Sequence, residues 1–118
     1  MHAALDAPLQ FHTQDTVDAV MVELLPTSYE TLRRDFDELR YHQFSPYPLL
    51  GLGSLSQFDP SRVPAGKSIL HLWDYVPYHR PDGRSWDEAK QDYADVMINH
   101  MKRFVRNVPD VILQKHVD

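Results

Sequence analysis

The pattern that decides the fold lies in residues 59–79, DPSRVPAGKSILHLWDYVPYH. A turn at residues 64–67 is followed by an apolar run from Ile69 to Val76, which Pro77 closes. Successive side chains of a strand point to opposite faces. We therefore expect a strand in which Ile69, His71, Trp73 and Tyr75 share one face. The other face would hold Leu70, Leu72, Asp74 and Val76, and its three apolar residues would pack beneath helices.

A first helix is expected after Pro26. Thr27 and Glu30 have the spacing of a capping box, in which side chain and backbone satisfy each other at a helix start. The apolar residues Leu32, Phe36 and Leu39 then recur at helical spacing, with charged residues between them. This pattern predicts an amphipathic surface helix of about three turns. The neighbouring acids Asp35 and Asp37 are expected on its solvated face.

A longer helix is expected after the turn at residues 80–84. Ser85 and Glu88 again have capping-box spacing, and one apolar face continues from Trp86 to Phe104. The helix should end near Asn107, two residues before Pro109. The tail, residues 110–118, is expected to add one more helical turn.

The other segments predict short strands. Residues 1–11 suit a strand broken at Pro8, and residues 52–57 suit a strand with a bulge at Gly51 or Gly53. Residues 18–26 fit either a strand or a helix, since they mix β-branched residues with good helix formers. Together these elements predict an α+β fold: a mostly antiparallel sheet with two principal helices packed on one face. The whole chain, residues 1–118, is expected to be a single domain.

Composition and charge exclude several classes of partner and chemistry. The net charge is −5, with acids and bases interspersed, so we expect no nucleic-acid partner, which would need a basic face. The chain has no cysteine, which excludes thiolate chemistry and disulfides. No apolar run is long enough for a membrane span, and the N-terminus lacks a basic, then apolar, leader pattern. A soluble, cytoplasmic protein is the expectation.

No motif for metal binding or nucleophilic catalysis is recognised. The seven histidines show neither an i, i+4 pair nor a His-x-His pattern, so no metal site is predicted. Ser54 loosely resembles the serine of a nucleophile elbow, but Pro60 and Pro64 follow it where a helix is required. We therefore assign no catalytic residue.

The strand face that carries His71, Trp73 and Tyr75 is the candidate site. Each of the three rings combines a large apolar body with a polar tip, and such faces line pockets and interfaces more often than they stand bare in water. The alternative is that the face simply packs beneath a loop. We name His71, Trp73 and Tyr75 as the expected substrate-binding residues.

Two blocks of the sequence resemble the phytoene-dehydrogenase-like group of flavin-dependent oxidoreductases. They are SLSQFDPSRVPAGKSILHLWDYVPYH and SWDEAKQDYADVMINHMKRFVRNVPDVI, and MHAALDAP is similar to a strand that precedes them in that family. The positions that match the family's pattern are Ser56, Asp59, Pro60, Ser61, Pro64, Gly66, Lys67, Val76, Pro77, Tyr78, Trp86, Asp87, Glu88 and Lys90.

The resemblance implies the middle, substrate-binding portion of a larger enzyme that is not competent alone. FAD is implied for the full-length family, but the glycine-rich flavin fingerprint is absent, so no cofactor-binding residue carries over. His71, Trp73 and Tyr75 would then line the cavity of an apolar small-molecule substrate, or meet the missing flavin-binding domain. A portion of this kind is also expected to self-associate through its uncovered face.

Two other readings of the sequence remain open. The chain can be a stand-alone small α+β domain for ligand binding or dimerisation, with the aromatic sheet face as its interface. It can also be a small enzyme without a cofactor that uses His71 as a base.

Overall fold

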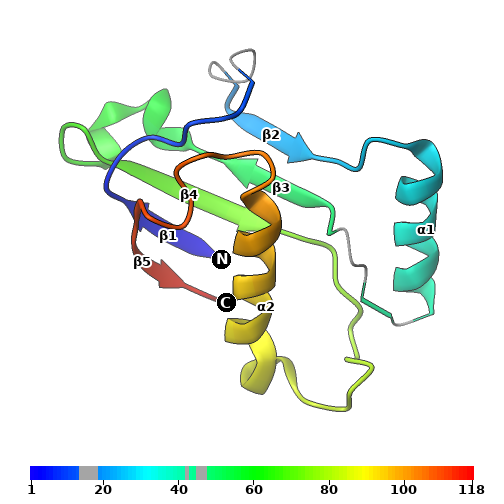
Figure 1. Ribbon diagram of the computed structural model, residues 1–118. Coiled ribbons are helices and arrows are strands. Elements are labelled where there is room, and N and C mark those ends of the chain that lie inside the picture. The colour runs from blue at the N-terminus through cyan, green and yellow to red at the C-terminus, as the bar shows by residue number, and fades with distance from the viewer. Residues whose placement is uncertain (14–18, 42, 45–47) are drawn as a thin grey trace.

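The sheet contains five strands in the order β2-β3-β4-β1-β5, and every neighbouring pair is antiparallel (Figure 1). The structure, a computed structural model, describes residues 1–13, 19–41, 43–44 and 48–118. The strands are β1 (His2–Leu5), β2 (Met21–Leu24), β3 (Leu50–Gly53), β4 (Ser68–Trp73) and β5 (Ile112–His116). The helices are α1 (Tyr29–Arg40) and α2 (Trp86–Met101), with short 3₁₀ turns η2 (Leu55–Gln57) and η3 (Pro60–Arg62).

The predicted α+β class is confirmed. Without β2, the elements follow one another as strand, helix, strand, strand, helix, strand, and the sheet order becomes β3-β4-β1-β5. This is the split β-α-β arrangement of ferredoxin-like folds. Strand β2 extends that arrangement by pairing with β3 at one edge. Strand β4 lies at the centre of the five, so its two faces decide what the sheet presents on either side.

Helix α2 lies across one face of the sheet (Figure 1). Its start is as predicted, because the Ser85 and Glu88 side chains form the capping box. It ends at Met101, earlier than the predicted Asn107, where the chain tightens into i→i−3 bonds: the Arg103 N–H donates to the His100 carbonyl oxygen and the Phe104 N–H to that of Met101. The largest fully buried side chains lie between α2 and the sheet or in the segment that follows α2. They are Leu5, Leu50, Leu52, Leu70, Leu72, Met101 and Val105.

Helix α1 lies to one side of α2, beyond the end of β2 (Figure 1). Its N-cap is Ser28 and not Thr27, since the Thr31 N–H donates to the Ser28 hydroxyl at 3.1 Å. The predicted inward face is also wrong at one position: Phe36 is 54% exposed, while Asp35 is 3% exposed. The helix therefore turns a carboxylate, rather than a phenyl ring, toward the rest of the molecule.

Several predicted strands are shifted. The segment at residues 18–26 is a strand, β2, although Asp18 lies outside the described residues. The strand predicted at residues 52–57 is β3, which ends at Gly53 and shows regular pairing with β4 and no bulge. The register shift falls instead between Ala4 and Leu5 of β1. The tail predicted to be helical is strand β5, because β1 offers an open edge for pairing.

Residues 54–57 turn away from the sheet because serine hydroxyls compete with the strand ladder. The Ser54 and Ser56 hydroxyls both lie within hydrogen-bond distance of the Ser68 hydroxyl, at 3.1 and 3.0 Å. The Ile69 N–H also donates to the Ser56 hydroxyl. This small network attaches η2 to the first residues of β4.

Both predicted turns are present. The Lys67 N–H donates to the Pro64 carbonyl oxygen at 3.0 Å, and the Gly83 N–H donates to the Arg80 carbonyl oxygen at 3.2 Å. Gly66 and Gly83 have φ values of 79° and 75°, which other residues rarely adopt. The two turns thus set the start of β4 and the approach to α2.

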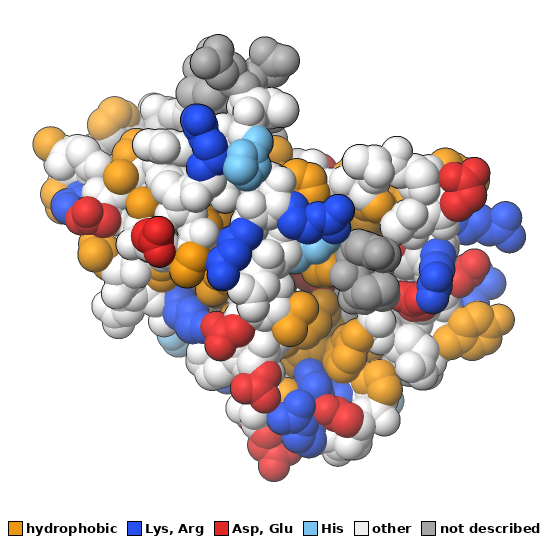
Figure 2. Space-filling model, viewed as in Figure 1, with side chains coloured by type: hydrophobic (Ala, Val, Ile, Leu, Met, Phe, Trp, Pro, Cys, Tyr) orange, Lys and Arg blue, Asp and Glu red, His pale blue; other side chains and the backbone are white. Residues whose placement is uncertain are grey.

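The surface in the view of Figure 2 carries lysine and arginine interspersed with aspartate and glutamate. Neither sign gathers into a large patch on this side of the molecule. Among the described helices, none has the length and apolarity needed to cross a bilayer.

Candidate functional site

The sheet face opposite α2 carries two of the three predicted site residues. In β4, Leu70 and Leu72 are buried beneath α2, while His71 and Trp73 point to the other side, as the alternation predicts. The His71 side chain is exposed, and the Trp73 ring is half-buried. We call this side, formed by the outward residues of all five strands, the open sheet face.

The register brings further histidines beside His71. His2 of β1 pairs with His71 on one side and with His116 of β5 on the other. The His2 and His71 rings are stacked, with centroids 4.3 Å apart and planes 12° apart, and Trp73 follows with its centroid 5.1 Å from that of His71. The open sheet face therefore holds a continuous row of rings that crosses strands.

Two glycines form the floor beside this row. Gly51 and Gly53 of β3 pair with Trp73 and His71 and bring no side chain to the open sheet face. A hollow of about 470 Å³ lies over part of the face. Its lining includes Leu55 and Arg62 at the rim and Ile69, His71, Gln114 and His116 from the strands. The hollow is open to solvent on one side and so forms only half of an enclosed cavity.

His71 is the electrostatically distinctive residue of this face. Burial lowers its pKa, and the nearby charges of His2 and the N-terminal amine lower it further, while Asp118 acts in the opposite direction. The imidazole is therefore neutral at physiological pH, able both to donate and to accept a hydrogen bond. Asp118 lies 3.3 Å from His2 and 3.1 Å from His116, so it faces this part of the row.

The third predicted residue, Tyr75, does not join the other two. Strand β4 ends at Trp73 and not at Val76, and Tyr75 is 65% exposed. The Asp74 carboxylate accepts a hydrogen bond from the Tyr75 N–H at 2.7 Å, which takes that N–H out of the strand ladder. Val76, expected to be buried, is also exposed.

Asp74 forms a second site that the sequence analysis missed. The Tyr93 hydroxyl of α2 donates to Asp74 Oδ2 at 2.6 Å. Burial raises the pKa of Asp74 to about 6, against the effect of the hydrogen bonds from Tyr93 and Tyr75. Burial and the Asp74 charge in turn raise the pKa of Tyr93. A carboxyl group that titrates near neutrality within a polar pair is typical of functional sites.

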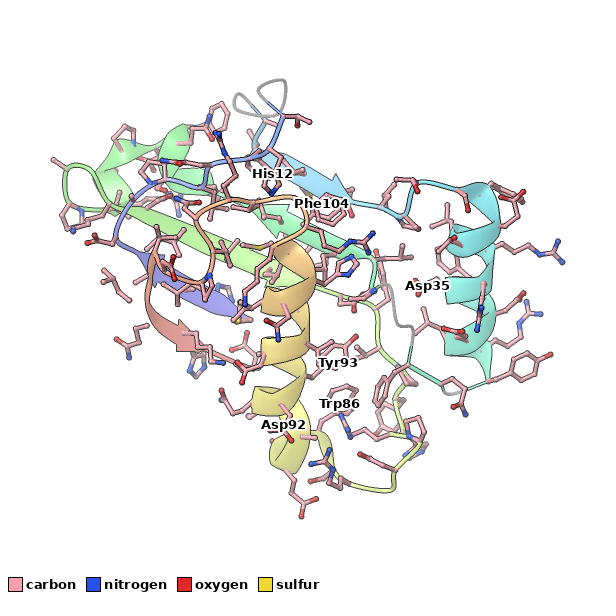
Figure 3. The ribbon with its side chains drawn as sticks, viewed as in Figure 1. His12, Asp35, Trp86, Asp92, Tyr93 and Phe104 are labelled. Atoms are coloured by element: carbon pink, nitrogen blue, oxygen red, sulfur yellow. The ribbon has the colours of Figure 1, made fainter. Side chains whose placement is uncertain are left out.

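Aromatic rings surround this pair. Trp86 meets Tyr93 edge to face at 5.5 Å, and its indole N–H donates to the Pro77 carbonyl oxygen at 3.1 Å. The Arg80 guanidinium lies 4.8 Å from the Phe44 ring and 4.9 Å from the Trp86 ring, and it is paired with Asp82. Figure 3 shows Trp86 and Tyr93 on one side of α2, with Asp35 of α1 across from them. These contacts fix the loop after β4 against α2.

Asp35 belongs to the same region, which corrects the expectation of a solvated residue. It is buried, its charge helps to raise the pKa of both Asp74 and Tyr93, and it lines a void of about 10 Å³ together with them. Such a void has about the size of one water molecule. Asp35 therefore adds negative potential around Asp74.

One signal in the sequence could have pointed to Asp74 but not to its partners. Asp74 shares a strand face with Leu70 and Leu72, which puts a carboxylate on the buried side, where ionised groups are costly. The pairing of His2 and His116 with His71 depends on the sheet order, which single-sequence patterns do not reveal. Among the described residues, no group of three or more histidine and acidic side chains is arranged to hold a metal ion.

Comparisons with known proteins identify no family. No protein-family model matches the sequence, and no curated protein is similar to it. The resemblance to the phytoene-dehydrogenase-like group therefore stays a prediction.

Proposed function

We propose that the chain is a small ligand-binding domain that works as a dimer, in which two open sheet faces meet and enclose an apolar small molecule. The observation that carries the proposal is the half-open hollow beside the ring row of His2, His71 and Trp73. A second copy would close this hollow with the same residues, as a twofold interface does.

The chemistry of the open sheet face suits such an interface. Its strand residues, read from the register, include one charged side chain, Glu23, and the amide Gln114, beside glycine, alanine, histidine and larger apolar residues. Depletion of charge and enrichment in aromatic residues and methionine are typical of the centre of an interface. Met21 and Leu55, both more than 40% exposed, lie on or beside this face and would be covered.

The size of the face sets what a dimer interface would have to include. Five strands spaced about 4.8 Å apart and four to six residues long span roughly 24 by 17 Å, or about 400 Å² of flat sheet. A stable interface buries about 800 Å² from each partner. The relief of the side chains and the η2 and η3 rim would therefore have to supply about half of the buried area.

The ligand would be apolar and contain a ring. The hollow offers Ile69 and Leu55 for apolar contact, and neutral His71 for one hydrogen bond or for stacking. The hollow is mostly apolar, as is usual for a small-molecule pocket, and Arg62, Gln114 and Lys115 add polar groups to its lining.

Sedimentation velocity over a range of concentrations tests the dimer. The natural chain should sediment as a dimer, and Ile69→Glu, which places a charge in the open sheet face, should sediment as a monomer. Gln91→Glu, an equally acidic change at an exposed position of α2, should remain a dimer. A natural chain that stays monomeric at high concentration would contradict the proposal.

The ligand part has a separate test. The dye 1-anilinonaphthalene-8-sulfonate should bind the natural dimer with enhanced fluorescence, and Ile69→Phe, which fills the hollow without adding charge, should reduce that binding. Equal dye binding by the natural chain and Ile69→Phe would show that the hollow takes no apolar ligand.

A second candidate is the substrate-binding portion of a phytoene-dehydrogenase-like flavin oxidoreductase. Its support is the same uncovered, ring-bearing face, which a flavin-binding domain would cover in place of a second copy. The oxidative chemistry would then come from FAD held elsewhere, and this chain would shape the cavity. We expect the chain alone to bind no FAD, so a yellow, stoichiometric complex in size-exclusion chromatography would contradict this candidate.

A further inference from the structure

A separate cavity of about 260 Å³ lies between the end of β4 and the first half of α2. Its apolar lining includes Leu72, Val76, Trp86 and Met97, and its polar lining includes Asp74 and Tyr93. It shares Trp73 with the ring row but does not include His71, Ile69 or the rim of the open sheet face. The dimer proposed above therefore gives no role to the polar groups of this cavity.

Asp74 is the polar centre of this cavity. Its main hydrogen-bond donors are the Tyr93 hydroxyl and the N–H groups of Tyr75 and Leu49. A carboxylate offers about four acceptor sites, so three donors leave one site for a ligand. The donors are neutral, and the nearby Asp35 adds a second negative charge. The Asp74 carboxylate thus has no cation among these hydrogen-bond donors.

We propose that this cavity binds a small primary amine with an apolar body, whose ammonium group donates to the Asp74 carboxylate. The body would contact Leu72, Trp86 and Met97. The ammonium would lie within reach of the Tyr93 and Trp86 rings, whose faces attract cations. The Arg80 guanidinium already lies over the Trp86 ring, 4.9 Å from its centroid, so the ring left to the ligand is that of Tyr93.

The size of the cavity limits the ligand. Pockets for drug-sized molecules measure about 300–1,000 Å³. A volume of about 260 Å³ falls below that range. The ligand is therefore a molecule such as benzylamine or a short alkylamine, with one ring or a chain of similar bulk.

Other charged groups around the cavity are already engaged in contacts of their own. Lys90 lines it, but its ammonium group lies 3.5 Å from an Asp87 carboxylate oxygen. Asp118 also lines it and adds negative charge, although it is shared with His2 and His116. Arg80 is paired with Asp82 at 2.7 Å. Met1 lines the cavity as well, and its ammonium group donates to the Leu72 carbonyl oxygen at 2.9 Å. With Lys90 and Met1 engaged in this way, Asp74, for which the described residues show no ion pair, is the charge left to a ligand, and it favours a cation over an anion.

Isothermal titration with three ligands of one shape tests the proposal on the natural chain. Benzylamine should bind at pH 7.5, whereas benzyl alcohol and benzoate should bind at least tenfold more weakly. Asp74 has a pKa of about 6, so it is mostly protonated at pH 5. The affinity for benzylamine should then be about tenfold lower than at pH 7.5. Benzoate binding tighter than benzylamine, or affinity for benzylamine independent of pH, would overturn the proposal.

Two variants localise the binding. Asp74→Asn should lose at least tenfold in affinity for benzylamine, and Asp95→Asn, which removes an exposed carboxylate of α2 outside the cavity, should bind it as the natural chain does. Loss of affinity in Asp95→Asn equal to that in Asp74→Asn would point to general surface charge and overturn the assignment. If Asp74→Asn does not fold, the ligand series and the pH dependence on the natural chain decide the question.

Discussion

The Trp73 indole ring lies directly over Gly51 of the neighbouring strand. A Cβ atom at position 51 would come within 2.1 Å of Trp73 Cε2, which no real structure tolerates. Gly51 is paired with Trp73 in the sheet, so its missing side chain is what allows the ring to lie flat against the open sheet face. The half-burial of Trp73, and with it the end of the ring row, depends on this glycine.

Gly51→Ala should therefore displace the Trp73 ring. We expect destabilisation of roughly 1–3 kcal/mol, the usual cost of overpacking, with a change in tryptophan fluorescence. Gly53→Ala is the matched control, because its added Cβ would be 3.7 Å from the nearest atom, an ordinary contact. Urea denaturation of both variants measures the difference. Equal stability of the two would show that the ring does not depend on Gly51.

Leu72 and Trp73 should respond in opposite ways to truncation. Leu72 is fully buried beneath α2, so Leu72→Ala should cost about 2–5 kcal/mol of stability. Trp73 is half-buried, so Trp73→Ala should cost less than Leu72→Ala but weaken dimer formation more. Urea denaturation and sedimentation velocity separate the two effects. A larger loss of stability in Trp73→Ala than in Leu72→Ala would contradict our assignment of the two faces.

Local patterns predicted the elements well where one interaction dominates. The Ser85–Glu88 capping box, both turns and the alternation of Leu70 and Leu72 with His71 are all present. The failures occur where distant contacts decide. The apolar tail became β5 because the edge of β1 was available, and Phe36 stayed exposed because Asp35 took the inward position.

The candidate site was predicted only in part for the same reason. His71 and Trp73 share a face because alternation within one strand is a local property. Tyr75 left that face because a side chain–backbone hydrogen bond from its own neighbour, Asp74, competed with the ladder. The Asp74–Tyr93 pair joins residues 19 positions apart on two elements. Its formation required the packing of α2 on the sheet, which no motif in the sequence describes.

Dimer formation should depend on pH through His71. Its pKa is lowered by burial and by the nearby positive charges of His2 and the N-terminal amine, opposed by Asp118. Closing the interface would bury the imidazole further, so protonation should weaken the dimer. We expect the dissociation constant to rise as pH falls from 7.5 to 5.

The variant His71→Gln should reduce this pH dependence, whereas His79→Gln, an exposed histidine outside the open sheet face, should leave it unchanged. Sedimentation equilibrium at several pH values measures both. The same pH dependence in His71→Gln and the natural chain would assign it to other groups.

Folding stability should also depend on pH through Asp74. Its pKa is about 6 in the folded chain, compared with about 3.9 for an unfolded aspartate. The folded state thus binds the Asp74 proton more tightly than the unfolded state does, so the protonated carboxyl group stabilises the fold. This stabilisation is fully present below about pH 4 and is lost as pH rises through 6. Partial exposure reduces the effect, to on the order of 2 kcal/mol. The lowered pKa values of His71 and His100 act in the opposite direction.

The comparison that isolates Asp74 is therefore the difference between the natural chain and Asp74→Asn, since both contain the two histidines. The free energy of unfolding of the natural chain, minus that of Asp74→Asn, should decrease between pH 4 and pH 7. Asp110→Asn, at an exposed position, should show no such trend. Tyr93→Phe should move the transition to higher pH, because the Tyr93 hydroxyl stabilises the ionised carboxylate. A flat difference between the natural chain and Asp74→Asn would mean that the Asp74 carboxyl titrates alike in the folded and unfolded chain.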